Sequence, residues 1–200
     1  ERSGCPPEKI QVARLGVDVS AIPWKQRAKS SGELNLIQIA AFTKKKGHQY
    51  TVRAFIEALQ DCPSMTLTLV GEDRAGIKTK LQRDVRQSGT GDKIIFKDSV
   101  NYDDLHMLLH DYHVFIHPSC YTERMDCEGG APVVLLDAQA TGMPVISTEH
   151  CDIPDEVTHG RTGLLCPEKD VAAIAAAIRN FYHMGQDDYN RYAGNAREHV

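Results

Sequence analysis

The sequence predicts an α/β protein with a doubly wound, mostly parallel sheet that carries helices on both faces. Short apolar runs alternate along the chain with longer stretches in which apolar residues recur at helical spacing. The alternation repeats about five times, which is typical of parallel strands joined by helical crossovers. The runs are almost continuously apolar, as expected for strands that are buried on both faces. These features indicate a Rossmann-like arrangement.

The expected strands are short apolar runs bounded by turn residues. They open with the isoleucine-rich run NLIQIAAF, and Pro118 marks the end of the fourth. In chain order they cover residues 35–42, 65–71, 93–97, 112–119, 143–148 and 163–166.

The expected helices show apolar residues at helical spacing together with start or stop signals. In chain order they cover residues 47–62, 77–87, 102–111, 132–141 and 170–185, and a last helix reaches Val200. The stop signals are Pro63, Gly89, Gly142 and Gly185. Asp103 and Asp104 suit the positive end of the third helix, and Asp170 is the expected N-cap of the fifth.

Residues 1–34 are expected to be an interdomain lead-in segment, and residues 35–200 a single domain. Within the lead-in, KQRAKSSGE at 25–33 predicts a mobile loop. The chain begins at Glu1 without a methionine, which favours a piece of a longer protein whose N-terminal domain is missing.

Composition excludes several classes of protein. The chain of 200 residues is 42% hydrophobic and 25% charged, which is ordinary for a globular domain, and its net charge of −4 argues against a nucleic-acid partner. No apolar run approaches the ~20 residues of a membrane helix. The six cysteines contain no C-x-x-C pair and are expected to be reduced, mostly buried thiols. A metal cluster is the less favoured alternative, and its ligands would be His117, Cys120, Cys127, His150 and Cys151.

Candidate functional residues follow the strands, because ligands of open α/β sheets bind beyond the carboxyl ends of the strands. EGGAP, residues 128–132, joins two glycines to a proline suited to the first turn of a helix. Free backbone N–H groups at such a helix start can bind phosphate, although a simple tight turn explains the glycines equally well.

Two carboxylates flank this stretch. Glu128 precedes the glycines and Asp137 lies inside the following helix, and carboxylates accept hydrogen bonds from sugar hydroxyls. An anion site between two hydroxyl acceptors describes a nucleotide sugar. The alternative for Asp137 is a solvated helix face.

TKKKG, residues 43–47, adds cations at the first strand exit. Of these, Lys46 is the candidate diphosphate ligand, and a solvated basic turn is the alternative.

Residues 128–170, from EGGAPVVLLDAQATGMPV to TGLLCPEKD, resemble the C-terminal, donor-binding half of family 4 glycosyltransferases, which have the GT-B fold. KKKGH resembles their Lys-Gly at the first strand exit, and EKIQVARLGVDVSAI resembles the segment that joins their two halves. The resemblance covers nearly the whole chain. It is closest to bacterial enzymes of exopolysaccharide, colanic-acid or lipopolysaccharide assembly.

The resemblance implies a role for each matching residue. Lys46 and Glu128 would be catalytic, Lys46 holding the donor diphosphate and Glu128 touching the transferred sugar. Asp137 would bind the ribose. The remaining donor-binding residues would contribute mainly backbone; they are Gly16 near the phosphates, Gly71, Lys97 and Asp98 around the base, and Gly129, Gly130 and Ala131 at the sugar and phosphate.

Three departures from the family pattern affect the site. Ala41 stands where the family usually has an arginine, so a diphosphate cation is missing unless Lys44, Lys45 or Arg124 replaces it. Eight residues separate the two carboxylates where the family commonly has seven, and the second acid is Asp rather than Glu.

The resemblance also implies an activity: retaining transfer of a sugar from UDP, GDP or ADP to a polysaccharide or lipid-linked acceptor, with no metal or other cofactor. The acceptor would bind through the missing N-terminal domain, so the fragment alone is expected to be inactive. The expected location is the cytoplasm, with peripheral contact at the inner face of the membrane.

Several alternatives remain open from the sequence. The protein could be a degenerate, non-catalytic nucleotide-sugar binding module, or an epimerase or phosphorylase-like enzyme of the same fold. A flavodoxin-like response domain is disfavoured, because lysines stand where it would carry a phosphoacceptor aspartate.

Overall fold

The structure is a computed structural model that describes residues 4–11 and 15–200. Its strands are β1 (Leu34–Ile39), β2 (Met65–Val70), β3 (Ile94–Lys97), β4 (Val114–His117), β5 (Val145–Thr148) and β6 (Gly163–Cys166). Its α-helices are α1 (His48–Leu59), α2 (Ile77–Gln87), α3 (Tyr102–Leu109), α4 (Val134–Ala140), α5 (Ile153–Glu156), α6 (Val171–His183) and α7 (Gln186–His199). Two 3₁₀ turns, η1 (Pro7–Lys9) and η2 (Lys44–Lys46), complete the regular structure of these residues.

The six strands form one sheet in the order β3-β2-β1-β4-β5-β6, and every pair is parallel. The chain builds outward from β1 to β3, crosses back to β4, and then builds outward in the other direction. This confirms the doubly wound, Rossmann-like fold. The direction of winding changes between β1 and β4, and the carboxyl edge of the sheet at such a change is where ligands of open α/β sheets bind.

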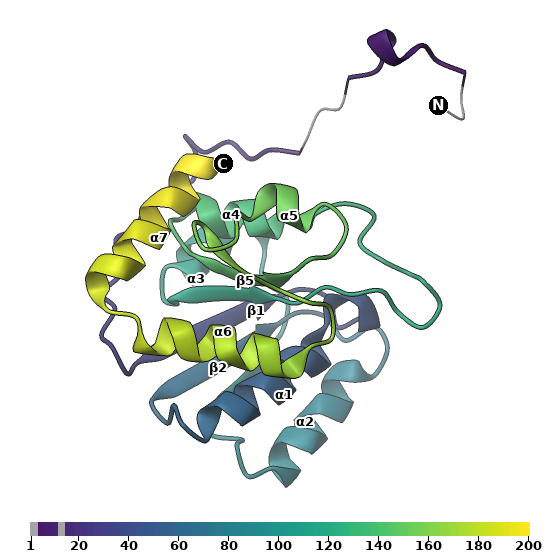
Figure 1. Ribbon diagram of the computed structural model, residues 1–200. Helices are drawn as coiled ribbons and strands as arrows, with labels where there is room; N and C mark the ends of the chain where they lie inside the picture. The colour runs from purple at the N-terminus through teal and green to yellow at the C-terminus, as the bar shows by residue number, and fades with distance from the viewer. Residues whose placement is uncertain (1–3, 12–14) are drawn as a thin grey trace.

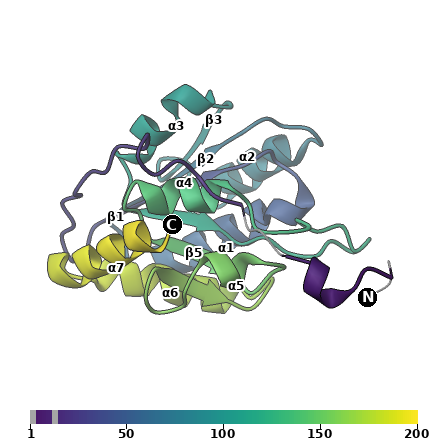
Figure 2. The same ribbon diagram turned by 90° about the horizontal axis from the view of Figure 1, so that it is seen from above.

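Helices cover both faces of the sheet, as Figures 1 and 2 show. Helices α1, α2 and α6 lie on one face, and α3, α4 and α5 lie on the other. Helix α6 packs along α1 although the two are far apart in the sequence. Each face has its own apolar core, and the sheet separates the two.

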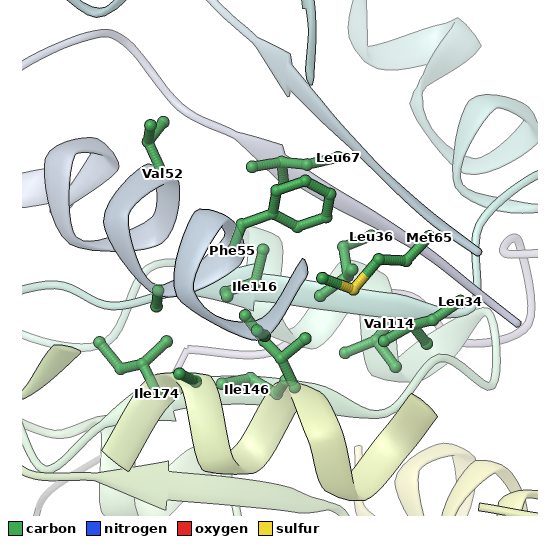
Figure 3. Packing of buried hydrophobic residues seen from close by; sticks show 14 of the residues in the cluster. Leu34, Leu36, Val52, Phe55, Met65, Leu67, Val114, Ile116, Ile146 and Ile174 are labelled. Carbon is green, nitrogen blue, oxygen red and sulfur yellow. The ribbon is translucent and has the colours of Figure 1, made fainter. Parts of the chain in front are cut away.

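Figure 3 shows the core on the α1 and α6 side. Phe55 of α1 and Ile174 of α6 point between the helices and the strands, and both side chains are fully buried. Full burial of such a side chain is worth about 1.5–3 kcal/mol. Asp170 caps α6, because its side chain accepts a hydrogen bond from the Ala173 amide at 2.9 Å. The N-cap predicted from the sequence is therefore confirmed, but packing contributes more to the placement of α6.

The segment before β1 is fixed to the domain, so the expectation of a mobile loop at 25–33 is wrong. Arg27 and Lys29 are buried. Arg27 donates to the Thr141 carbonyl at 2.8 Å and to the Leu109 carbonyl at 3.2 Å. Lys29 Nζ donates to the Tyr182 carbonyl at 3.2 Å. The segment is polar because its buried cations donate hydrogen bonds to carbonyls at the ends of helices. These helices are distant in the sequence, so the local sequence of residues 25–33 does not predict the contacts.

The remaining differences from the sequence-based elements are local. The connection after β5 contains a short helix, α5, with a proline in its first turn. The lysine run forms the 3₁₀ turn η2. Helix α4 begins at Val134 instead of Pro132. Among the described helices, none combines the length and apolarity needed to span a bilayer.

Candidate functional site

Lys46 is held rigidly where β1 leaves the sheet. The Gln38 side chain of β1 donates to the Lys46 carbonyl at 2.7 Å, and Thr51 donates to Gln38 at 2.7 Å. The next residue, Gly47, has a φ of 69°, and a Cβ there would lie 1.9 Å from the Pro118 carbonyl oxygen. The exits of β1 and β4 can therefore approach this closely only because Gly47 has no side chain.

The structure brings Lys46 and Glu128 together across this junction. Lys46 Nζ lies 2.6 Å from Glu128 Oε2, and only 20% and 6% of the two side chains are exposed. Ser119 donates to the other carboxylate oxygen at 2.7 Å. Burial raises the pKa of Glu128, but the contacts with His117, Lys46 and Ser119 outweigh it and hold the pKa at about 2. Glu128 is thus a fixed anion beside a fixed cation.

His117 lies beneath this pair. Its Nε2 is 3.8 Å from Glu128 Oε1, too far for a hydrogen bond, and neither ring nitrogen has a partner within the described part of the chain. Burial lowers the pKa of His117, more than its contact with Glu128 raises it. The His117 imidazole next to Glu128 is therefore neutral.

The three consecutive lysines of η2 pair with three acids of the loop between β4 and α4. Lys44 lies 3.1 Å from Glu123, and both side chains are mostly exposed. Lys45 lies 3.4 Å from Asp126 and also donates to the Cys127 carbonyl at 2.8 Å. The alternative of a purely solvated basic turn is therefore wrong. Lys45 is held by the loop, whereas Lys44 makes only a surface ion pair.

A second set of residues supports Glu128 from the opposite side. The Glu128 amide donates to His150 Nε2 at 3.2 Å, and His150 Nδ1 lies 2.7 Å from Glu168 Oε1. The other oxygen of Glu168 accepts from the Tyr121 amide at 2.9 Å. One carboxylate after β6 thus holds both ends of the loop 121–128. Sequence reasoning considered His150 only as a metal ligand and missed Glu168 entirely.

The glycines that follow Glu128 form an open backbone surface. Gly129 has a φ of 77° and is exposed. Within residues 4–11 and 15–200, the N–H groups of Gly129, Gly130 and Ala131 donate to no other residue. Leu135 donates to the Pro132 carbonyl at 3.0 Å, so a turn precedes the first residue of α4. These amides are free to receive an anion.

Asp137 is buried, which contradicts the alternative of a solvated helix face. Its side chain is 3% exposed, and its Oδ1 accepts hydrogen bonds from Tyr102 at 3.0 Å and His106 Nε2 at 2.9 Å. Both partners come from α3, and Tyr102 itself is 61% exposed. Partial burial and the contact with Asp137 raise the pKa of Tyr102. Neither Tyr102 nor His106 was a candidate in the sequence analysis.

Gly71, Lys97 and Asp98 meet at the ends of β2 and β3. The Gly71 amide donates to the Lys97 carbonyl at 3.3 Å, and a Cβ on Gly71 would lie 1.9 Å from the Ala40 carbonyl oxygen. Lys78 of α2 organises the group, donating to the Lys97 carbonyl and to Asp98 at 2.8 Å each. Lys78 was not a sequence candidate. A role for this edge around a base stays a prediction.

Gly16 is exposed, with no described heavy atom within 4 Å of where its Cβ would lie. Its role near the phosphates also stays a prediction. All six cysteines are free thiols. Among the described residues, no group of three or more His, Cys, Asp or Glu is placed to hold a metal ion, and this includes the cluster around His117 and His150.

Comparison with known proteins identifies the family. The family of group 1 glycosyl transferases matches residues 23–199. The chain is 32% identical over 197 residues to a Salmonella typhimurium protein named colanic acid biosynthesis glycosyltransferase WcaL, covering 98% of this chain and 48% of that protein. It is 30% identical over 177 residues to the amylovoran biosynthesis glycosyltransferase AmsK of Erwinia amylovora, covering 88% and 42%. The chain therefore spans about half the length of these relatives.

Solved structures show the same fold. The C-terminal domain of the group 1 glycosyl transferase LpcC from Francisella tularensis superposes with a TM-score of 0.78 at 21% identity, covering 92% of this chain and 96% of that one. Anabaena HepE in complex with UDP-glucose gives a TM-score of 0.79 at 18% identity, covering 98% of this chain and 54% of that one. The GT-B half predicted from the sequence is thereby confirmed as the fold.

Proposed function

Because the chain belongs to the group 1 glycosyl transferases, we propose that it binds the nucleoside diphosphate sugar from which such an enzyme transfers a sugar to an acceptor hydroxyl. The observation that carries the proposal is the Lys46–Glu128 pair, 2.6 Å apart at the point where the sheet changes its winding direction. This is where open α/β sheets bind ligands.

Each part of the donor has a matching group around this pair. The diphosphate lies between Lys46 and the open amides of Gly129, Gly130 and Ala131. The transferred sugar lies against Glu128, whose low pKa keeps it an acceptor of hydroxyl hydrogen bonds. The ribose reaches Asp137, and the base lies along the edge formed by Gly71 and Asp98. Anabaena HepE, which shares the fold, was solved in complex with UDP-glucose, and this supports a donor of this chemical class.

Catalysis in this proposal is electrostatic. Negative charge develops on the diphosphate as the bond to the sugar breaks, and Lys46 together with the loop amides stabilises that charge more in the transition state than in the substrate. The proposal assigns no step to a metal. It includes retention of configuration at the sugar and a saccharide or lipid-linked saccharide acceptor.

The acceptor side of the reaction needs residues outside this sequence, since the chain spans about half of its relatives. We therefore propose that these 200 residues bind the donor but transfer little or no sugar alone. A cytoplasmic location with contact at the inner membrane face belongs to the same proposal and follows from the acceptor class.

The first prediction concerns the charge of Lys46. UDP-, GDP- or ADP-glucose at millimolar concentration should raise the Tm of the protein, and Lys46→Ala should remove at least tenfold of the affinity of the best ligand, about 1.4 kcal/mol. Differential scanning fluorimetry and calorimetry measure the two effects. Lys44→Ala is the matched control, because Lys44 is an exposed neighbour in the same turn.

The outcomes separate the alternatives. Removing Lys46 leaves Glu128 buried without its cation, so circular dichroism and urea unfolding of Lys46→Ala are measured beside its binding, to separate lost binding from lost folding. Undiminished binding by Lys46→Ala contradicts the diphosphate assignment. If the unchanged protein binds no nucleotide sugar, the degenerate, non-catalytic module is favoured. That alternative was raised because Ala41 stands where the family usually has an arginine.

A further inference from the structure

A thiol, an imidazole and a carboxylate stand in line beside the candidate site. Cys151 Sγ lies 3.2 Å from His150 Nε2, and His150 Nδ1 lies 2.7 Å from Glu168 Oε1. Cys151 and His150 follow β5, and Glu168 follows β6, so the pairing of these two strands holds the three groups together. A nucleophile in reach of a base that a third group orients is the arrangement of activated nucleophiles in enzymes.

The hydrogen bonds around His150 decide its tautomer. The Glu128 amide donates to Nε2 at 3.2 Å, so Nε2 carries a lone pair and the ring hydrogen sits on Nδ1, facing Glu168. The Cys151 thiol and the Glu128 amide each lie 3.2 Å from Nε2 and compete for its single lone pair, so the thiol proton can pass to Nε2 when the amide gives way. The other polar group facing the sulfur is the Tyr121 hydroxyl, 3.9 Å away.

The backbone at Cys151 is also unusual. Its φ is 48°, in the left-handed region that residues other than glycine rarely adopt. Backbone strain of this kind, about 1–3 kcal/mol, concentrates at functional sites. Cys151 is partly exposed.

We propose that Cys151 is an activated thiol and a site of covalent modification by soft carbon electrophiles, specifically α,β-unsaturated carbonyl compounds. His150 takes the thiol proton, and the sulfur lone pair forms an S–C bond to the β-carbon of the electrophile. The C=C π electrons move to the α-carbon, which then takes the proton from His150. The reaction is an addition, so no group leaves and no oxidant is needed.

The other cysteines provide internal references. Burial raises the pKa of Cys62, Cys120 and Cys166, to about 11 for the last two, so these thiols are protected and weakly nucleophilic. Cys127 is partly exposed like Cys151 and lies on the adjacent loop, but within the described chain no histidine lies in hydrogen-bond reach of its sulfur. Cys127 is therefore the matched reference thiol.

Modification of Cys151 should disturb the hydrogen bond between the Glu128 amide and His150. When His150 holds the thiol proton, Nε2 can no longer accept the Glu128 amide hydrogen, and an adduct on the sulfur lies beside the same nitrogen. Modified protein is therefore expected to bind nucleotide sugar more weakly. This consequence rests on the proposed function, whereas the reactivity of the thiol does not.

The test labels the native chain with acrylamide and follows each cysteine by peptide mass spectrometry. Cys151 is expected to react at least tenfold faster than Cys127. His150→Gln should bring the Cys151 rate down to that of Cys127, and Glu168→Gln should lower it at least threefold. Glu149→Gln, an exposed neighbour, is the control and should leave both rates unchanged.

Equal labelling of Cys151 and Cys127 in the unchanged protein overturns the proposal, and this comparison needs no variant to fold. An unchanged Cys151 rate in a folded His150→Gln protein, judged by circular dichroism and Tm, overturns it as well. Fast labelling of Cys151 that leaves UDP-glucose binding unaltered keeps the activated thiol and rejects only its link to Glu128.

Discussion

At the scale of single residues, the site is built from charges whose partners are already in place. Glu128 has Lys46 and Ser119 on its two oxygens, and Asp137 has Tyr102 and His106 on one of its own. A donor would exchange protein contacts for ligand contacts at both carboxylates. Such exchange costs little when the incoming hydroxyl or phosphate replaces a hydrogen bond with one of the same kind.

The pH dependence of stability should reveal the Glu128 environment. Its pKa of about 2 lies below the ordinary value near 4.5, so Glu128 stabilises the fold above pH 4.5 and this contribution is lost as the pH falls toward 2. The contribution is on the order of 3 kcal/mol, at 1.36 kcal/mol per pKa unit. Urea unfolding of the unchanged protein and of Glu128→Gln from pH 2 to 7 should show a difference that vanishes at the acid end.

The control for this measurement is Glu123→Gln. Glu123 pairs with Lys44 on the surface, where ion pairs contribute about 0–1 kcal/mol. Its variant should therefore differ from the unchanged protein by no more than about 1 kcal/mol at any pH. A Glu128→Gln difference that stays constant down to pH 2 would show that the carboxylate is not held in its charged form by these contacts.

Asp137 is predicted to accept a hydrogen bond from a ribose hydroxyl of the donor. The oxygen that Tyr102 and His106 do not touch, Oδ2, is the one that can accept from a ribose hydroxyl. A hydrogen bond to a charged group is worth about 1.5–3 kcal/mol, so UDP should bind at least tenfold more tightly than 2′,3′-dideoxy-UDP. Asp137→Asn should reduce this ratio several-fold in calorimetry, whereas Asp103→Asn, exposed on α3, should preserve it. An unchanged ratio in Asp137→Asn places the ribose elsewhere.

At the scale of elements, close contact between strand exits sets the geometry. Helices α1 and α2 both begin after a left-handed glycine, Gly47 at φ 69° and Gly76 at φ 69°. A Cβ on Gly76 would meet no atom within 4 Å, whereas one on Gly47 would collide with the Pro118 carbonyl. The two glycines share a backbone conformation but differ in their surroundings. Gly76 only begins a helix, whereas Gly47 also allows the backbone at Pro118 to pack against it.

This pair gives a matched experiment. Gly76→Ala should cost only the left-handed strain, about 1–2 kcal/mol. Gly47→Ala adds the displacement of a backbone carbonyl, and it should cost about 1–3 kcal/mol more. It should also weaken nucleotide-sugar binding, because Lys46 moves with it. Chemical denaturation of both variants measures the difference, and equal destabilisation would mean that the β1 and β4 exits separate freely.

At the scale of the whole molecule, the last helix and the lead-in segment from about residue 19 meet at the end of α4. Arg197 of α7 donates to the Val19 carbonyl at 2.9 Å and to the Ala140 carbonyl at the end of α4. Arg27 reaches the neighbouring Thr141 carbonyl from the segment before β1. Figure 1 shows α7 lying along this side of the domain, with the chain terminus beside the lead-in segment. The lead-in from about residue 19 is therefore part of the folded unit.

Truncation of Arg27 should destabilise the entire domain. Burial lowers the pKa of Arg27, but its guanidinium satisfies buried carbonyls at the ends of α3 and α4. Arg27→Ala leaves these acceptors unpaired and should cost about 3 kcal/mol, seen as a lower midpoint in urea. Lys25→Ala, two residues earlier and exposed, should cost less than about 0.5 kcal/mol. Similar values for both would contradict a structural role of the lead-in.

The sequence by itself determined the class of fold and the strand exits that carry Lys46 and Glu128. Hydrophobic periodicity and the cap residues are local properties, so residues 77–87 could be placed to the residue and Asp170 identified as a cap. The family resemblance then assigned roles to residues such as Lys46 and Glu128, which were already candidates because they follow predicted strands.

Only the tertiary structure decided which side chains support those residues. His150 reaches Glu128 from the exit of β5 and is itself held by Glu168 from the exit of β6, Tyr102 crosses from α3 to Asp137, and Arg27 is buried at helix ends far along the chain. Each of these contacts joins segments that are distant in the sequence, and each depends on the order of strands in the sheet. No local pattern encodes such distances, because they arise when the sheet brings separate loops to one edge.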